Sequence, residues 1–369
     1  MIYKLKSKSI ALMSMLLFSS CSTIIPLLIP FQDIPAPTGS FSVGTRVFNW
    51  EDNKREEWFT EKEGDFRKIV VQVWYPTDEV TGVPVPYLDF AQHRIKPISE
   101  QVELPPFMIK HIQDVNSNSY MNASLKSTTE PYPLVIFSHG LGGMRMQNTI
   151  QMEELASKGF IALAMDHAFD ANVTIFNDGS SADYRSAIIG EVTTEEFWNI
   201  RLPQINTRVA DVSFVLDYIK DIQGGDDSFL NMIDLGRVGI MGHSFGGGTA
   251  IVASSRDTRL DACIALDGWL VPIEQSIIKK GLKVPFLFMG QTYWTNPVNY
   301  ENLDTLIAAS TASAEKLILD GTKHFDYSDT PYFSTMAKKF GISGKLPAEE
   351  ILSILNEQII TFFDKHVKN

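Results

Sequence analysis

The 369-residue chain has only two cysteines, Cys21 and Cys263. Two cysteines cannot form a disulfide framework or a cysteine-based zinc site, so both classes are excluded. Cys263 lies in the apolar run ACIAL and is expected to be an inert core thiol. Basic residues are also few: the chain has 32 Lys and Arg and 44 Asp and Glu, which gives a net charge of −12. Such a chain repels phosphate backbones, which argues against nucleic acid as a partner. No cofactor motif or metal-ligand cluster is visible, so no cofactor and no metal are expected.

The apolar run at residues 10–18 is too short to span a bilayer by itself. It follows three lysines and leads into two serines and Cys21, a pattern typical of an export signal. The sequence LFSSC at residues 17–21 resembles a bacterial lipobox, in which the cysteine is lipidated and becomes the mature N-terminus. We therefore expect a signal peptide over residues 1–20 and a lipid anchor on Cys21. The protein would be an exported lipoprotein of the bacterial cell envelope, in the outer membrane or periplasm. A plain signal peptide, with a secreted product, or an uncleaved anchor is the alternative.

Strand and helix signals alternate after a Pro-, Ser- and Thr-rich stretch at residues 21–45, which indicates a tether. Seven apolar runs have strand length and are continuous, as in strands buried on both faces of a parallel sheet. These runs are residues 69–74, 134–137, 160–165, 238–241, 263–266, 285–289 and 317–319. Helical patterns occur at residues 153–158, at 205–219 and from 347 onwards. This rhythm predicts one α/β domain over residues 46–369, with a mostly parallel central sheet and helices on both faces.

Two stretches lack this rhythm, residues 85–130 and residues 168–200. Either they are loops or short helices that flank an active site, or they are peripheral insertions with no role.

The pentapeptide Gly242-His243-Ser244-Phe245-Gly246 has the pattern G-x-S-x-G. The apolar strand RVGIM runs directly into it, and the small-residue run GGGTAIVAS follows as a helix. This is the strand–elbow–helix setting that the motif requires. Its glycines allow a tight turn that lifts the serine above the sheet edge, and the helix directs its N-terminus toward developing negative charge. Ser244 is the expected nucleophile; the alternative is a glycine-rich turn that holds a serine by chance.

A serine hydroxyl needs a base, and α/β hydrolases place the triad in the order Ser, acid, His. Among the seven histidines, only His324 lies in the loop that follows the last predicted strand; His366 is near the C-terminus. Asp267 ends the run ACIALD, and 267 − 244 = 23 residues after the serine leave room for one helix and one strand. A buried carboxylate there would fix the tautomer of the imidazole. Asp320 and Asp326 are rival acids, which we expect instead to cap or solvate the loop of His324.

The oxyanion hole should combine the backbone N–H of Phe245, just after the nucleophile, with one from an earlier strand–helix loop. The strand PLVIFS opens into HGLGG at residues 139–143, and we assign the second donor to Leu141. Each donor is worth about 3 kcal/mol of transition-state stabilisation. The same loop could instead be only a tight connection. Trp269 and Leu270, which follow the acid, are expected to wall the acyl pocket, although core packing explains Leu270 equally well.

Together these segments resemble the plasma-type platelet-activating factor acetylhydrolases, the lipoprotein-associated phospholipases. The similarity covers most of residues 36–330, through TGSFSVGT, YPLVIFSHGLGG, LASKGFIALAMDH, GHSFGG, CIALDGWL and GTKHFDYSD. The resemblance implies an α/β-hydrolase fold and a calcium-independent enzyme that cleaves short or oxidised sn-2 acyl groups from phospholipids. Carried over by position, the family's triad falls on Ser244, Asp267 and His324, and its oxyanion donors fall on Leu141 and Phe245.

The resemblance thus implies a serine carboxylic ester hydrolase that acts on short-chain phospholipid esters, such as 1-alkyl-2-acetylglycerophosphocholine, through an acyl-enzyme. Two alternatives stay open. The elbow GHSFGGG is also similar to the GHS-x-GGG elbow of cutinase-like polyesterases, which favours a general carboxylesterase. A non-catalytic surface lipoprotein could keep the same fold for binding, although the ordered Ser, Asp and His set argues against it.

Overall fold

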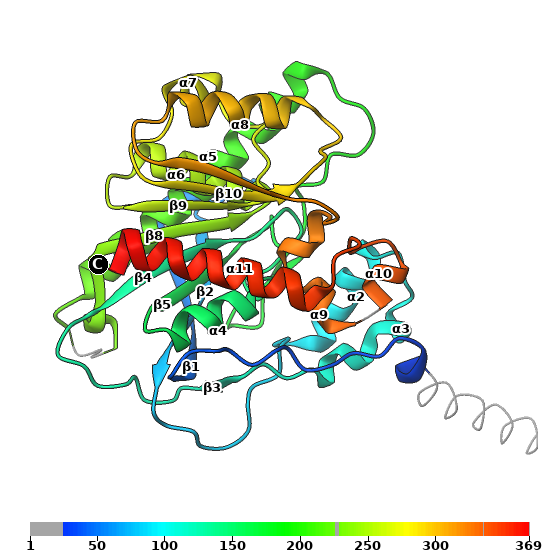
Figure 1. The fold of residues 1–369 in the computed structure, drawn as a ribbon, viewed down its shortest axis with the longest axis vertical. Helices are drawn as coiled ribbons and strands as arrows, with labels where there is room; N and C mark the ends of the chain where they lie inside the picture. Colours follow the sequence, from blue (N-terminus) through cyan, green and yellow to red (C-terminus); the bar gives the residue numbers. More distant parts are fainter. Residues whose placement is uncertain (1–24, 226–228, 335, 369) are drawn as a thin grey trace, which may run out of the picture.

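The computed structural model describes residues 25–225, 229–334 and 336–368, so the expected export signal and Cys21 lie outside the described residues. The main strands are β1 Ser42–Glu56, β2 Phe66–Thr77, β3 Ser119–Met121, β4 Tyr132–Ser138, β5 Ile161–His167, β8 Ile233–His243, β9 Ala262–Leu266, β10 Phe286–Gln291 and β11 Ala314–Leu319. They form one sheet in the order β11-β10-β9-β8-β4-β5-β2-β1-β3 (Figure 1). Neighbours from β11 through β5 run parallel. The predicted α/β fold with a mostly parallel central sheet is therefore confirmed.

Helices cover both faces of this sheet. The helices are α2 Ala91–Gln101, α3 Pro106–Ile109, α4 Thr149–Ser157, α5 Thr194–Ile222, α6 Phe245–Arg256, α7 Gln275–Lys280, α8 Val298–Ala309, α9 Thr330–Phe333, α10 Met336–Lys339 and α11 Ala348–Phe363. Helices α4 and α11 pack on one face, while α5, α6, α7 and α8 pack on the other, so that each face has its own apolar core (Figure 1). Within the described ranges, no helix has both the length and the apolarity needed to cross a membrane.

One strand runs in the opposite direction to the one expected. The apolar run at residues 69–74 lies in β2, which is antiparallel to both β5 and β1. A continuous apolar run reports burial on both faces, and β2 is almost wholly buried, but burial says nothing about strand direction. Strand β1 was not expected at all, because many of its residues are exposed or half-buried and its apolar positions follow no clear alternation.

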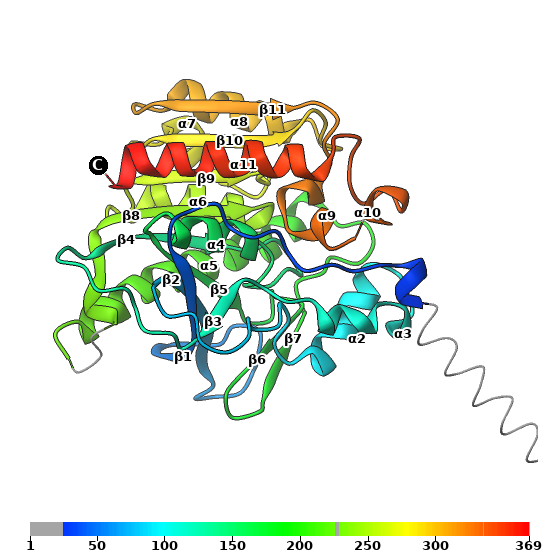
Figure 2. The same cartoon turned by 60° about the horizontal axis from the view of Figure 1, so that its bottom comes forward.

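The segment expected to be a tether at residues 21–45 packs on the domain over much of its length. Ile34 is buried, and the side chain of Thr38 donates to the Glu154 carboxylate over 2.6 Å. Figure 2 shows this segment, in dark blue, crossing the domain from a helical turn at residues 25–28 to the start of β1. The expected boundary at residue 46 is therefore too late, because a Pro-rich segment with few apolar residues can still dock through isolated side chains.

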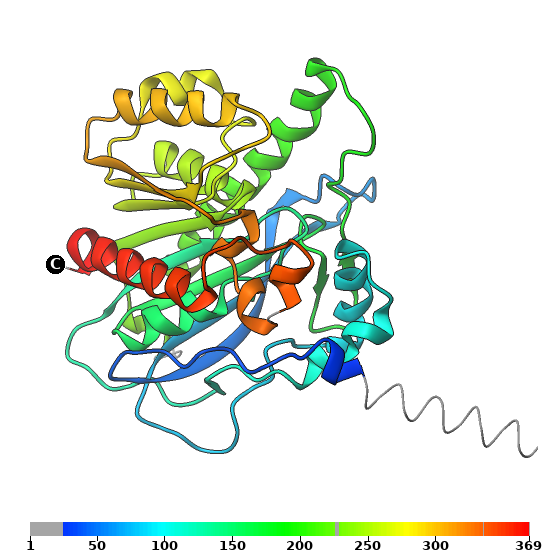
Figure 3. The ribbon, with the colours of Figure 1, turned by 45° about the vertical axis from the view of Figure 1, so that its right-hand side comes forward.

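The two stretches without clear rhythm form mostly small elements. Residues 85–130 contain α2, α3, the 3₁₀ helix η1 Lys110–Asp114 and β3, while residues 168–200 form the hairpin β6 Val173–Ile175 and β7 Ser181–Asp183 and the start of α5. A third apolar cluster joins α2 and α3 to α9, and Figure 3 shows the cyan helices next to this orange segment. Arg94 links the two stretches, because its Nη1 donates to the Val173 carbonyl over 2.8 Å.

Candidate active site

Ser244 lies at a strained turn between β8 and α6. Its φ of 56° and ψ of −121° fall in a region that non-glycine residues rarely occupy, which is typical of functional turns. The backbone holds this turn against β9, because the Ser244 N–H donates to the Leu266 carbonyl over 3.0 Å. The neighbouring Gly246 is needed for close packing, since a Cβ there would lie 2.0 Å from the Ser138 carbonyl oxygen. These contacts explain why the G-x-S-x-G pattern presents its serine at the carboxyl edge of the sheet.

Asp267 and His324, which the sequence predicts to be the acid and the base, lie in hydrogen-bond contact. His324 Nδ1 lies 2.6 Å from Asp267 Oδ2, and the carboxylate is fully buried while the imidazole is partly exposed. Asp267 also accepts from the backbone N–H and Nε2 of Gln291, at 3.2 and 2.8 Å, and from Trp294 Nε1 at 3.0 Å. A carboxylate on Nδ1 fixes the tautomer that leaves Nε2 free to accept a proton.

The two rival acids have other roles. Asp326 is buried and accepts from the Lys323 and Gly344 amides, so it closes the loop that carries His324. Asp320 is exposed and accepts from the amide of Gly321, which follows it. Neither bonds the imidazole, in line with the expectation that they cap or solvate the loop.

The loop at residues 139–143 lies against Ser244. A Cβ on Gly140 would lie 3.3 Å from the Ser244 Cβ, and Gly142 has a φ of +65°, so the glycines permit this approach. The structure gives the Leu141 amide no acceptor among the residues that it describes. The Phe245 amide is the first of α6, where helical geometry supplies no partner. Two backbone donors are thus available beside the serine, as an oxyanion hole requires.

A buried ion pair that the sequence did not reveal holds this loop. Arg208 on α5 donates from Nη1 to the His139 carbonyl over 2.6 Å and from Nε to Asp170 over 2.7 Å. The Asp170 carbonyl in turn accepts from the Gly142 amide over 2.9 Å. One signal could have indicated this: α5 carries charged residues at 201, 208 and 211 among its buried positions, and buried charges need partners.

A second missed residue, Gln147, joins the oxyanion loop to the base. Its Oε1 accepts from the Gly140 amide over 3.1 Å, and its Nε2 lies 2.6 Å from His243 Nδ1. His243 Nε2 lies 2.9 Å from the His324 carbonyl oxygen. Burial, and then the charge of His324, hold the pKa of His243 well below its ordinary value. His243 is therefore a neutral spacer between the elbow and the base loop, with Nδ1 as acceptor and Nε2 as donor.

The fold contains another Ser–His–Asp array, which is fully enclosed. Ser138 Oγ lies 2.9 Å from His167 Nε2, and His167 Nδ1 lies 2.8 Å from Asp211. Arg67 grips the same Asp211 carboxylate through two hydrogen bonds. Burial lowers the pKa of His167 to about 4, so it stays neutral. The His167 side chain is 0% exposed, whereas that of His324 is 29% exposed. Of these two histidines, solvent therefore reaches only His324.

The two expected wall residues differ in their surroundings. Trp269 is half-buried, with its ring 5.8 Å from that of Phe245 and 5.9 Å from that of Phe197. Its amide donates to the Ser244 carbonyl over 2.8 Å, so it borders the nucleophile. Leu270 is fully buried in the core and its amide donates to Asn299. The position of Leu270 therefore favours core packing over a place in the wall of the acyl pocket.

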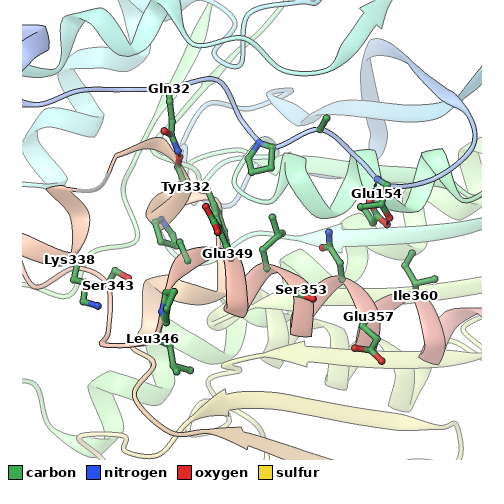
Figure 4. Close-up of a pocket in the computed structure, with 18 of the residues that line it drawn as sticks. Gln32, Glu154, Tyr332, Lys338, Ser343, Leu346, Glu349, Ser353, Glu357 and Ile360 are labelled. Carbon is green, nitrogen blue, oxygen red and sulfur yellow. Dashed lines mark hydrogen bonds between the residues drawn. The ribbon is translucent and has the colours of Figure 1, made fainter.

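A groove of about 960 Å³ opens elsewhere on the domain, between the N-terminal segment, α9 and α11 (Figure 4). Among its lining residues, Gln32 Nε2 donates to the Tyr332 carbonyl over 2.9 Å, and Glu349, Ser353 and Glu357 line its α11 side. None of its lining residues belongs to the triad or to the oxyanion loop, so it is separate from this site. In the part of the chain that the structure describes, no group of His, Cys, Asp and Glu side chains is arranged to hold a metal ion.

Comparison with known proteins gives consistent matches. A family model described as platelet-activating factor acetylhydrolase, isoform II, matches residues 29–369. The platelet-activating factor acetylhydrolase of Gallus gallus is 27% identical over 284 residues, which cover 70% of this chain and 67% of that protein. That of Canis lupus familiaris is 25% identical over 358 residues, covering 90% and 77%. Among solved structures, a ferulic acid esterase from Streptomyces cinnamoneus aligns with a TM-score of 0.74 and 25% identity, covering 91% of this chain and 93% of that one.

Proposed function

The chain belongs to the platelet-activating factor acetylhydrolase family, and from that premise we propose that it hydrolyses short or oxidised sn-2 acyl esters of phospholipids through Ser244, His324 and Asp267. One observation carries the assignment of residues. His324 and Asp267, whose side chains are 2.6 Å apart, lie beside the strained serine turn. The His324 ring is 4.5 Å from that of His243, the residue directly before Ser244. The family membership supports a serine carboxylic ester hydrolase, and the geometry supports Ser244 as its nucleophile, His324 as its base and Asp267 as its acid.

The chemistry follows from these positions. His324 Nε2 takes the Ser244 hydroxyl proton as Oγ attacks the ester carbonyl, and the amides of Leu141 and Phe245 hold the resulting oxyanion. His324 then returns the proton to the departing alcohol, which leaves an acyl-serine. A water molecule gives a proton to His324 and attacks the acyl-serine. Collapse of this second oxyanion releases the carboxylic acid and returns the proton to Ser244. Asp267 stabilises the imidazolium throughout, without taking its proton.

The deciding experiment is calcium-free hydrolysis of three esters by the wild type and by Ser244→Ala: a 2-acetyl glycerophosphocholine, a long-chain phospholipid and 4-nitrophenyl butyrate. We expect preferential acetyl release that the Ser244→Ala variant loses by about 10⁴-fold or more, while circular dichroism shows it folded. Retained activity in that variant would contradict the nucleophile. Serine-dependent cleavage of the nitrophenyl ester alone would keep the mechanism and reject the phospholipid substrate.

A general carboxylesterase is the second candidate. The observation that favours it is the alignment with a ferulic acid esterase over 91% of this chain. A kcat/KM for 4-nitrophenyl butyrate or a hydroxycinnamate ester that exceeds the value for the acetyl phospholipid would select this candidate.

We also propose that residues 1–20 are an export signal and that a lipid on Cys21 holds the enzyme at the cell envelope. Eight positions separate Cys21 from the packed Ile29 (29 − 21 = 8), so the anchor would keep this end of the domain close to a membrane. Leu27, Leu28 and Phe107 are exposed apolar side chains in this region, where His111 Nε2 lies 2.6 Å from the Ile29 carbonyl oxygen. This arrangement supports contact with a lipid surface.

The anchor is tested by expressing the full chain with labelled palmitate and separating membranes from soluble protein. We expect labelled protein in the membrane fraction for the wild type and unlabelled protein for Cys21→Ser. Soluble, unlabelled wild-type protein would reject the anchor and leave the hydrolase assignment unaffected.

A further inference from the structure

Arg201 on α5 is a buried cation without a carboxylate partner. Only 4% of the residue is exposed. Four other buried arginines of the described ranges each pair with at least one carboxylate; they are Arg67, Arg94, Arg145 and Arg208. The carboxylate of Asp170, which attracts Arg201, is already held by Arg208, Gln204 and Ser186. A buried charge that no carboxylate neutralises is costly, so its retention calls for a role.

One edge of the guanidinium has no acceptor. Nη1 donates to the Ser186 carbonyl over 2.9 Å and to Gln204 Oε1 over 2.6 Å. Nε is enclosed with no partner, and Nη2, which is not enclosed in this way, has none among the described residues. The Nε and Nη2 edge is the one with which Arg67 grips both oxygens of Asp211, at 3.1 and 2.6 Å. Its geometry suits any anion that offers two oxygens side by side, such as a carboxylate or a phosphate.

The guanidinium lies near two residues that adjoin the catalytic serine. The Arg201 Cζ is 5.5 Å from the Trp269 ring centroid and 6.0 Å from that of Phe245. Trp269 bonds the Ser244 carbonyl, and the Phe245 amide is an oxyanion donor. Tyr184, which interacts electrostatically with Arg201, also lies next to Gly142 of the oxyanion loop. Burial lowers the pKa of the Arg201 guanidinium, and the opposing effects of Tyr184 and Asp170 do not cancel that shift. A bound anion would offset this cost.

Building on the proposed ester hydrolase function, we propose that Arg201 is a substrate-anion subsite that selects esters carrying a carboxylate or a phosphodiester. Nη2 meets the anion first, and Nε completes a two-oxygen contact once the side chains that enclose it shift. The two possible sources are a carboxylate at the far end of the acyl chain and the phosphodiester of a phospholipid head group. Both present the same pair of oxygens, and they lie on opposite sides of the scissile ester, so matched substrates separate them.

The test compares kcat/KM for three esters in the wild type, Arg201→Gln and Arg201→Lys. The esters are 4-nitrophenyl butyrate, which is neutral, mono(4-nitrophenyl) glutarate, which ends in a carboxylate, and a 2-acetyl glycerophosphocholine. We expect Arg201→Gln to lower the ratio of an anionic ester to butyrate at least tenfold, and Arg201→Lys to keep part of that ratio. A fall for the glutarate assigns the acyl carboxylate, and a fall for the phospholipid assigns the phosphodiester. Equal changes for all three esters would overturn the subsite.

The matched control is Arg185→Gln, which removes an exposed arginine from the same stretch of chain. Its ratios are expected to stay within twofold of the wild type; a larger change would assign the preference to general charge attraction instead. Binding gives a readout independent of turnover. In Ser244→Ala protein, Arg201→Gln should weaken the calorimetric Kd for the preferred anionic ester at least tenfold, and an unchanged Kd for both anionic esters also overturns the subsite. If the wild type shows no serine-dependent hydrolysis of any of these esters, the proposed function is contradicted. The binding comparison would still test whether Arg201 binds the anion.

Discussion

The imidazole of His243 donates from Nε2 to the backbone carbonyl of His324 over 2.9 Å, and the two rings lie 4.5 Å apart. The residue just before the nucleophile thus supports the loop of the base. On its other side, His243 accepts from Gln147, which also holds the Gly140 amide. This line of hydrogen bonds connects the oxyanion loop, the serine turn and the base, which are the three parts that must keep their relative positions during catalysis.

We expect Gln147→Leu to lower kcat about tenfold, because it releases both the oxyanion loop and His243 at similar side-chain volume. His243→Leu should have an effect of the same order, and the double variant should lose less than the product of the two effects, since both act through one line of contacts. The measurement is kcat and KM for 4-nitrophenyl butyrate. The control is Gln151→Leu, which removes a buried amide one turn along that bonds Asn148 and Asn356 rather than the site. A kcat in Gln147→Leu that equals the control value would contradict the prediction.

Asp267→Asn is expected to lower kcat about 10⁴-fold. An amide can donate to Nδ1 of His324 and thereby favour the wrong tautomer, and it cannot stabilise the imidazolium. The rival Asp326→Asn should mainly reduce stability, because that carboxylate holds the amides of Lys323 and Gly344 and the hydroxyl of Ser343. Kinetics and urea unfolding of both variants separate these roles. A larger loss of kcat in Asp326→Asn than in Asp267→Asn would reverse the assignment of the acid.

Trp294 is expected to position the acid–base pair. Its Nε1 donates to Asp267 over 3.0 Å, and its ring packs edge-on against the His324 imidazole at 5.2 Å. Trp294→Phe removes the N–H and keeps most of the ring, so we expect kcat to fall about tenfold with little change in KM. The acidic limb of the pH profile of kcat/KM should move to higher pH, because a carboxylate with one donor fewer stabilises the imidazolium more strongly. A loss of stability with an unmoved pH profile would show a merely structural role.

His167 should make stability depend on pH. Burial lowers the pKa of His167 from 6.5 to about 4. Between pH 6.5 and pH 4 this histidine is therefore protonated in the unfolded chain and neutral in the folded protein. Stability therefore falls as the pH drops through this window, by up to about 3 kcal/mol for 2.5 pKa units. In His167→Gln this contribution disappears. The advantage of the wild type over the variant in unfolding free energy, measured with urea from pH 7 to pH 4.5, should shrink accordingly. A difference that stays constant over this range would refute the prediction.

Much of the fold and of the candidate site could be predicted from local patterns. A strand buried on both faces needs a continuous apolar run, and all seven predicted runs fall on strands of the sheet, two of them starting one residue early. The run at residues 317–319 falls on the partly exposed edge strand β11, so there the apolar run does not reflect burial on both faces. The direction of β2 could not be predicted, because burial and direction are independent. The docking of residues 29–41 on the domain could not be predicted from the sequence either. It depends on a few contacts between residues far apart in the chain, such as Thr38 and Glu154, which are 116 positions apart.

The sequence by itself determined where a serine, an acid and a histidine could follow the ends of successive strands, because parallel strands deliver their carboxyl ends to one edge. Only the tertiary structure decided which charges and amides surround them. Gln147 meets His243 across 96 positions, and Arg208 meets the oxyanion loop across 69. The fold also decided that His167 is sealed from solvent while His324 is partly exposed, and that the buried Nε of Arg201 has no acceptor. Partnership and solvent access are properties of the packed chain, and no local pattern encodes them.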